Sequence, residues 1–285
     1  MRKIKLPISK IISEYNSGLS SLELAKKYNV SKKVILDRLR KAHIDRRSIS
    51  ASKRKYSLNE DYFENIDTEE KAYWLGFLLA DGNISYSGRY NKGRHLRIAL
   101  QNKDKNHLEK MKFSLKSNYN LKLDKNNCFW LCFNSLKLTK DLENLGWFDF
   151  KKNGNTRILE SVNITLRKHL IRGLIDGDGW IFDAKRRWIL GFVDLHKSTV
   201  DWFHEYIQSI GFGKKTKVKK CLKANAWKVA YSNKKVPDLL KHFYEKSKIN
   251  LDRKYDLFLL SQNTKPIPKK LGSEIISEDD LNKIL

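Results

Sequence analysis

The sequence predicts an α+β protein in which two related α/β subdomains follow a small helical domain. Residues 73–82 and 170–179 are apolar runs, each with an internal glycine and an Asp-Gly ending, and the two aspartates are 97 residues apart. Strand-like segments recur in the same order, since 129–133 is echoed 98 residues later by 227–231. A repeat of roughly 100 residues is too long for a solenoid and indicates two homologous subdomains in one chain.

A further pair of strand-like segments follows the two apolar runs. Residues 96–100 align with 188–192 at an offset of 92, and the smaller offset predicts a longer hairpin loop, 85–93, in the first copy. The apolar residues of the first segment alternate with polar ones, which is typical of a half-buried strand.

Size and charge limit the function. The 285 residues can bury a core in two or three domains. A formal net charge of +26 predicts a polyanionic partner, most simply nucleic acid. No apolar run is long enough to span a bilayer, and the N-terminus lacks the apolar core of a signal peptide. We therefore expect an intracellular protein located with the genome, in a prokaryotic or phage-infected cell or an organelle, and no membrane partner.

Changes in composition divide the chain into five segments. They are a helix-turn-helix DNA-binding module (1–48), a basic linker (49–70), a first subdomain (71–160), a second subdomain (161–262) and a C-terminal tail (263–285).

The N-terminal module carries two helix signals. Residues 20–29 begin with serine, and Ser31 is a suitable N-cap for 32–41. The second helix would present basic side chains to DNA, as a recognition helix does; these are Lys32, Lys33, Arg38 and Arg40. An ordinary helical hairpin with a solvated basic face remains the alternative.

The two aspartates, Asp81 and Asp178, lie at the expected C-terminal ends of apolar helices, where the helix dipole disfavours a carboxylate. Gly76 and Gly173, five residues earlier, predict close packing of the two helices, which would bring the carboxylates together. Two adjacent carboxylates repel each other unless a divalent cation bridges them. Oxygen ligands favour Mg²⁺, or another divalent cation such as Mn²⁺.

These motifs resemble those of the LAGLIDADG homing endonuclease family, in its single-chain form with two motifs. Residues 171–179 match the motif closely, whereas 74–82 depart from it at Leu79, where the family usually has an acidic residue. The similarity extends over roughly residues 60–260.

The resemblance implies a fold and an activity. Each subdomain would be an αββαββα unit, and the two antiparallel sheets would lie over the DNA major groove. The expected reaction is a double-strand break in a long asymmetric target by metal-assisted phosphodiester hydrolysis, performed by a monomer. The family pattern assigns the metal to Asp81 and Asp178, with the backbone carbonyls of Ala80 and Gly177. It also implies charge-stabilising roles for Lys137 and Lys235, which share the offset of 98, and solvent-organising roles for Asn102 and Asp194.

The sheets supply the candidate DNA contacts. In the first copy these are His95, Arg97 and Gln101. In the second copy Ile189, Gly191 and Val193 would occupy the equivalent face, and the cations are Arg186, Arg187, Lys214, Lys215, Lys217 and Lys219.

Two other functions fit this fold. An RNA maturase would help its host intron to splice and would bind intron RNA, and a DNA-binding regulator would be catalytically weak. Retention of both aspartates argues against a pure regulator, and a helix-turn-helix argues against a role on RNA alone, because A-form grooves exclude such a helix.

Overall fold

The computed structural model describes residues 6–45, 56–87, 93–184, 187–221 and 224–263, and the chain divides after Ser57 into two compact units. Part of the expected linker, Arg186, and all of the expected tail except residue 263 lie outside the described residues. The α+β class is confirmed, with two four-stranded antiparallel sheets in the second unit.

The N-terminal unit contains three helices, α1 (Ile8–Asn16), α2 (Ser21–Lys27) and α3 (Lys32–Lys41). Ser20 and Glu23 form a capping box on α2, and the Ser31 hydroxyl caps α3. Asn29 has a φ of 51°, the left-handed conformation that asparagine tolerates, and it makes the turn between α2 and α3. Ile11 and Ile35 belong to a hydrophobic core of this unit.

The second unit consists of two copies of one arrangement. The first copy contains α5 (Glu69–Asp81), β1 (Gly82–Ser87), β2 (Gly93–Gln101), α6 (Lys105–Ser114), β3 (Lys122–Leu123), β4 (Cys128–Asn134), α7 (Leu136–Leu145), α8 (Trp147–Asn153) and α9 (Arg157–Glu160). The second copy contains α10 (Arg167–Asp178), β5 (Gly179–Asp183), β6 (Trp188–Asp194), α11 (Lys197–Ser209), β7 (Lys219–Lys220), β8 (Trp227–Ser232), α12 (Val236–Tyr244) and α13 (Asp252–Asn263).

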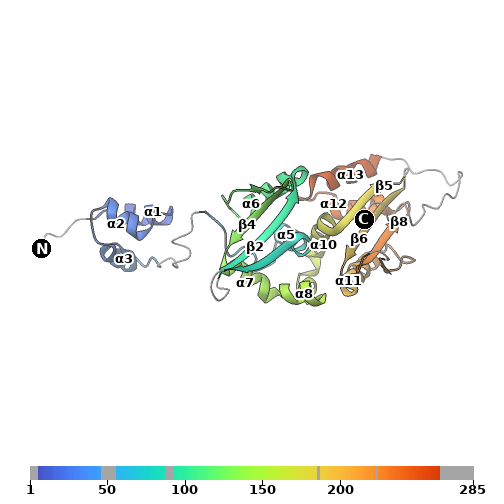
Figure 1. The fold of residues 1–285 in the computed structure, drawn as a ribbon, viewed down its shortest axis with the longest axis horizontal. Coiled ribbons are helices and arrows are strands. Elements are labelled where there is room, and N and C mark those ends of the chain that lie inside the picture. Colours follow the sequence, from blue (N-terminus) through green and yellow to red (C-terminus); the bar gives the residue numbers. More distant parts are fainter. Residues whose placement is uncertain (1–5, 46–55, 88–92, 185–186, 222–223, 264–285) are drawn as a thin grey trace. The chain divides into compact units, whose positions relative to one another are not determined.

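The two sheets have the same topology. Their strand orders are β1-β2-β4-β3 and β5-β6-β8-β7, and every pairing is antiparallel. Figure 1 shows α5 and α10 next to each other between the two sheets. Helix α5 buries every residue from 72 to 79, as expected of a helix surrounded by protein. The predicted αββαββα units are therefore confirmed.

One sequence alignment is wrong by two residues. Gly82 pairs with Ile98 in the first copy, and Gly179 pairs with Phe192 in the second, so the equivalent strand positions are 94 residues apart rather than 92. A shift of two residues leaves each side chain on the same face of a strand. The hydrophobic pattern therefore could not reveal the error. The offset of 98 does hold for β4 and β8, because Leu131 and Val229 pair with the same two residues, Ile98 and Phe192.

Candidate active site and nucleic-acid interface

Two glycines lie where α5 and α10 cross. A Cβ atom on Gly76 would be 2.0 Å from the carbonyl oxygen of Leu170, and one on Gly173 would be 2.2 Å from that of Tyr73. No Cβ atom tolerates such distances, so both positions need glycine for the two backbones to touch.

The close crossing continues to the C-terminal ends of both helices, where Asp81 and Asp178 lie. A Cβ atom on Gly177 would be 2.2 Å from the Ala80 Cβ and 3.4 Å from Asp81 Oδ2. Asp81 therefore packs against the last turn of α10. Burial raises the pKa of Asp178 to about 7, and the negative charge of Asp81 contributes in the same direction. The structure thus brings the two carboxylates together.

Asp81 is accessible to solvent, and the pKa of its carboxyl group is shifted. The residue is exposed, yet protein atoms surround its carboxyl group densely enough for burial to raise its pKa. The positive charges of Lys254 and Lys151 oppose this shift. The exposed surface also leaves the Asp81 carboxylate reachable by a ligand.

Two lysines accompany the aspartates. The ammonium group of Lys151, in α8, donates a hydrogen bond of 2.9 Å to the carbonyl oxygen of Ala80. Burial lowers the pKa of Lys151, and Asp178, Asp194 and Asp81 oppose the shift. An ammonium group partly removed from water and close to carboxylates is suited to stabilise a developing negative charge.

Lys254, in α13, is 2% exposed. Its ammonium group donates hydrogen bonds to three carbonyl oxygens at the end of α10, those of Ile175 (2.5 Å), Asp176 (2.8 Å) and Gly179 (2.6 Å). Burial lowers the pKa of Lys254 to about 8. Lys254 therefore offsets the negative end of the α10 dipole, directly behind Asp178.

The two lysines for which the family resemblance implies a role, Lys137 and Lys235, lie elsewhere. Lys137 forms ion pairs with Asp61 (3.4 Å), Glu64 (3.2 Å) and Asp141 (2.8 Å). Lys137 follows β4, whose last residues pair with the start of β2. Asp81 precedes Gly82, which pairs with Ile98 near the end of β2. Lys137 and Asp81 therefore lie near opposite ends of β2.

Lys235 is also in a different setting from the one expected. It is exposed immediately before α12. The cations that most lower the pKa values of Asp81 and Asp178 are instead Lys151, Lys254 and Arg253. Lys151 and Lys254 are 103 residues apart. At the offset of 98 that relates β4 and β8, position 151 corresponds to Ile249 rather than to Lys254, so the repeat gave no signal for this pair.

A pocket of about 280 Å³ opens beside Asp178, and Ala80, Lys151, Asp194 and His196 are among its lining residues. Asp194 accepts a hydrogen bond of 2.7 Å from the His196 backbone N–H, and burial raises its pKa. The structure therefore brings Asp194 to the site.

Asn102, which the sequence alignment paired with Asp194, lies in a different environment. The register of the two sheets instead makes Leu100 the strand residue equivalent to Asp194. Asn102 is exposed in a 3-10 turn (Asn102–Asp104), and its backbone N–H donates to the Asn127 carbonyl oxygen at 3.2 Å. The two copies therefore differ in the groups available to organise solvent.

Asp176 has a structural role behind the site. It accepts hydrogen bonds from the hydroxyl groups of Tyr73 (2.7 Å) and Tyr244 (2.6 Å) and from the backbone N–H of Leu251 (2.8 Å). Tyr73 belongs to α5, so Asp176 links both central helices to the C-terminal segment. Its counterpart in the first motif, Leu79, is simply buried, which shows why an apolar residue is tolerated there.

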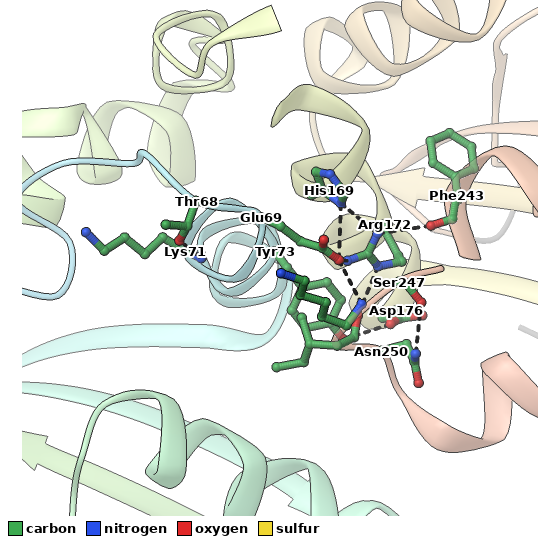
Figure 2. Close-up of polar contacts among 12 residues, drawn as sticks. Thr68, Glu69, Lys71, Tyr73, His169, Arg172, Asp176, Phe243, Ser247 and Asn250 are labelled. Carbon is green, nitrogen blue, oxygen red and sulfur yellow. Dashed lines mark hydrogen bonds and ion pairs between the residues drawn. The ribbon is translucent and has the colours of Figure 1, made fainter. Parts of the chain in front are cut away.

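A buried ion pair reinforces the same junction. Arg172 of α10 forms an ion pair of 2.8 Å with Glu69 at the start of α5. It also donates to the carbonyl oxygens of Ile249 and Phe243, both at 3.0 Å. Figure 2 shows Arg172 between Glu69, His169 and Phe243. All three nitrogen atoms of the guanidinium group therefore have partners, and the group stabilises the crossing that places Asp81 beside Asp178.

The donor groups fit a hard divalent cation. Within the described ranges, no group of three or more His, Cys, Asp or Glu side chains could hold a metal ion. Mg²⁺ often uses only one or two carboxylates and completes its shell with water and phosphate oxygens. Asp81 and Asp178 could provide the two carboxylates. The carbonyl oxygen of Ala80, which was expected to bind the metal as well, accepts a hydrogen bond from Lys151. The metal-binding role expected of the Gly177 carbonyl oxygen stays a prediction.

The expected DNA contacts are mostly on the surface. Arg97 and Gln101 are exposed on one face of β2 and His95 is half-buried there, while Leu96, Ile98 and Leu100 face the core. In the second copy the exposed cations are Arg187, Lys214, Lys215, Lys217 and Lys219. In the N-terminal unit Lys32, Lys33 and Arg40 are exposed and Arg38 is half-buried. Among the described residues, no helix is long and apolar enough to cross a membrane.

No protein-family model and no curated protein matches the sequence. Among solved structures, the meganuclease I-SmaMI bound to uncleaveable DNA aligns with a TM-score of 0.50 and 16% identity, over 67% of this chain and 89% of that chain. I-AabMI bound to uncleaved DNA gives a TM-score of 0.48 and 17% identity, over 67% and 90%. I-LtrWI bound to target DNA gives a TM-score of 0.46 and 15% identity, over 79% and 96%. The resemblance carried by the two motifs is thus confirmed in three dimensions, and the protein has the fold of the LAGLIDADG homing endonucleases with both halves in one chain.

Proposed function

We propose that the protein is a LAGLIDADG homing endonuclease that makes a double-strand break in a long asymmetric DNA target by divalent-metal-assisted phosphodiester hydrolysis. The observation that carries this proposal is the pair Asp81 and Asp178, at the touching ends of two buried helices. A fold that needed only to bind DNA would gain nothing from two adjacent carboxylates whose pKa values are raised by burial.

The chain's own groups divide the chemistry between them. Asp81 and Asp178 would hold the divalent cation, Mg²⁺ or Mn²⁺. The cation supplies an activated water and neutralises charge on the phosphate. Lys151 places an ammonium group beside both carboxylates, where it would stabilise the negative charge that develops on the phosphate oxygens. Asp194 lies in the same pocket and would orient solvent there.

DNA is the partner that the surface favours. The chain has a net charge of +26, and both sheets carry exposed cations or polar side chains on or beside one face. I-SmaMI, which shares the fold, was crystallised bound to DNA. Two unlike halves in one chain would act as a monomer on an asymmetric site, and the N-terminal helices would bind DNA as a helix-turn-helix module that extends the contact.

The test is removal of each carboxylate charge without a change of shape. Asp81→Asn and Asp178→Asn should each reduce double-strand cleavage by about 100-fold or more, because an amide cannot replace an anionic ligand. Binding to the same duplex should be preserved. Asp183→Asn, which changes an exposed aspartate at the end of β5, is the matched control and should cut normally. Normal Mg²⁺-dependent cutting by either active-site variant would disprove the assignment.

A further inference from the structure

The outer faces of the two sheets differ at equivalent positions. In the first sheet, Asn83, Arg97 and Cys132 lie side by side across three strands. The equivalent residues of the second sheet are Trp180, Gly191 and Ala230. The neighbouring row of paired residues shows a similar change. In the first sheet this row consists of Ser85, His95 and Asn134, and in the second sheet of Phe182, Ile189 and Ser232. In these two rows, polar side chains of the first sheet are replaced mainly by apolar ones in the second. In the next row, Ala99, Trp130 and Lys122 correspond to Val193, Lys228 and Lys219, so the change is confined to the part of the face around Trp180 and Phe182.

Trp180 covers the middle of the second face. A Cβ atom on Gly191 would be 2.1 Å from Cζ2 of the Trp180 indole, so the ring lies flat over the glycine. Trp180 and Phe182 are half-buried. Of the described residues of β6, Trp188, Leu190 and Phe192 join the central core, whereas Ile189 is only 3% exposed but does not belong to that core. The apolar side chains of the outer face therefore form a layer that is separate from that core.

Lysines border this layer. The row that contains Val193 continues to Lys228, which pairs in turn with Lys219. The loop before β7 adds Lys214, Lys215 and Lys217, all exposed. A basic edge would repel a second copy of the same face, whereas it matches the phosphates along a DNA groove.

We propose that the second sheet recognises its half of the DNA target through thymine C5-methyl groups, whereas the first sheet recognises its half through hydrogen bonds. This inference rests on the proposed endonuclease function. Thymine is the base that presents a methyl group in the major groove, and apolar side chains contact it there. The donors and acceptors of a G·C pair would lose water against Trp180 and Phe182 without gaining partners.

The experiment starts with cleavage selection by the full chain on a randomised duplex library. The variant Arg97→Ala assigns the halves, because it alters the selected bases only on the side of the first sheet. Thymidines of each half are then replaced by deoxyuridine, which lacks the methyl group. In the half of the second sheet, each replacement should weaken binding by about fourfold, the value of one buried apolar carbon. In the other half it should change affinity little.

Reciprocal variants provide the matched control. Phe182→Ser gives the second sheet the residue found at the equivalent position of the first, and it should lose the penalty for deoxyuridine. Ser85→Phe should acquire such a penalty in the first half.

The possible failures are distinguishable. A site that is enriched and cut, but tolerates deoxyuridine equally in both halves, would overturn this inference and leave the endonuclease function intact. A library from which no sequence is enriched would overturn both. Because the deoxyuridine measurement uses the wild-type protein, a variant that does not fold cannot obscure the result.

Discussion

At the scale of single residues, the site depends on charges that are partly removed from water. Asp81, Asp178 and Asp194 all have pKa values raised by burial, whereas the pKa values of Lys151 and Lys254 are lowered by it. Each group is thus shifted toward its neutral form, and a cation and a phosphate entering the site would restore the charges. Ligand binding and ionisation are therefore coupled.

Lys151 gives the first residue-scale prediction. Lys151→Met should slow cleavage of bound DNA by about 10-fold or more, because one stabilising charge is lost beside Asp178. Lys137→Met is the matched control, since Lys137 is paired with Asp61, Glu64 and Asp141 instead. Single-turnover cleavage and equilibrium binding should be measured for both. If Lys137→Met were the slower enzyme, the offset-based assignment would be right and the structural one wrong.

The ionisation of Asp178 gives a prediction for stability. Its folded pKa of about 7 is above the ordinary value of 3.8. The folded state therefore keeps a proton that the unfolded chain has released, so this group stabilises the fold at low pH and loses that effect as the pH rises from about 4 through 7. In metal-free buffer, Asp178→Asn should melt at a temperature higher than wild type by roughly 5 °C at pH 8.

The same measurement at pH 4 should show a much smaller difference, since wild-type Asp178 is then protonated as well. Mg²⁺ should raise the melting temperature of the wild-type protein at pH 8 and leave the variant nearly unchanged. If the difference in melting temperature between the two proteins were the same at every pH in this range, Asp178 would not be the group whose ionisation changes the stability.

At the scale of elements, repetition made the fold predictable. The two central helices, the alternating face of β2 and the offset of 98 between β4 and β8 all follow from the sequence. The glycines were informative because Gly76 and Gly173 contact backbone atoms of the partner helix directly. Such contacts leave no alternative residue, so they are visible in one sequence.

Other features of the elements were not predictable, for identifiable reasons. The register of β6 was missed by two residues because its hydrophobic pattern repeats with that period. Lys151 and Lys254 were missed because each reaches the site from a helix beyond the last strand of its copy. In a chain with 58 lysines and arginines, only three-dimensional placement separates these two from solvated surface charges.

At the scale of the whole molecule, the chain joins one N-terminal unit to a core built from two halves. The N-terminal unit has its own hydrophobic cluster around Ile11, Leu24 and Ile35, distinct from the cluster of the second unit. Separate cores allow separate folding. The single copy of this unit also adds to the asymmetry that the two unlike sheets create.

A truncated chain that begins at Leu58 tests what the N-terminal unit contributes. Because the core of the second unit contains no described residue before Leu58, the truncated protein should fold and still cut. Its affinity should fall, since the lysines and arginines of α3 no longer neutralise phosphates, and the slope of log K against log salt should decrease by about one unit per lost contact. Footprinting should show protection receding from one end of the site only. A matched full-length variant with Lys32, Lys33 and Arg40 changed to alanine should reproduce the loss of affinity without any truncation. If both proteins kept full affinity and an unchanged footprint, the three helices would not be a DNA-binding module.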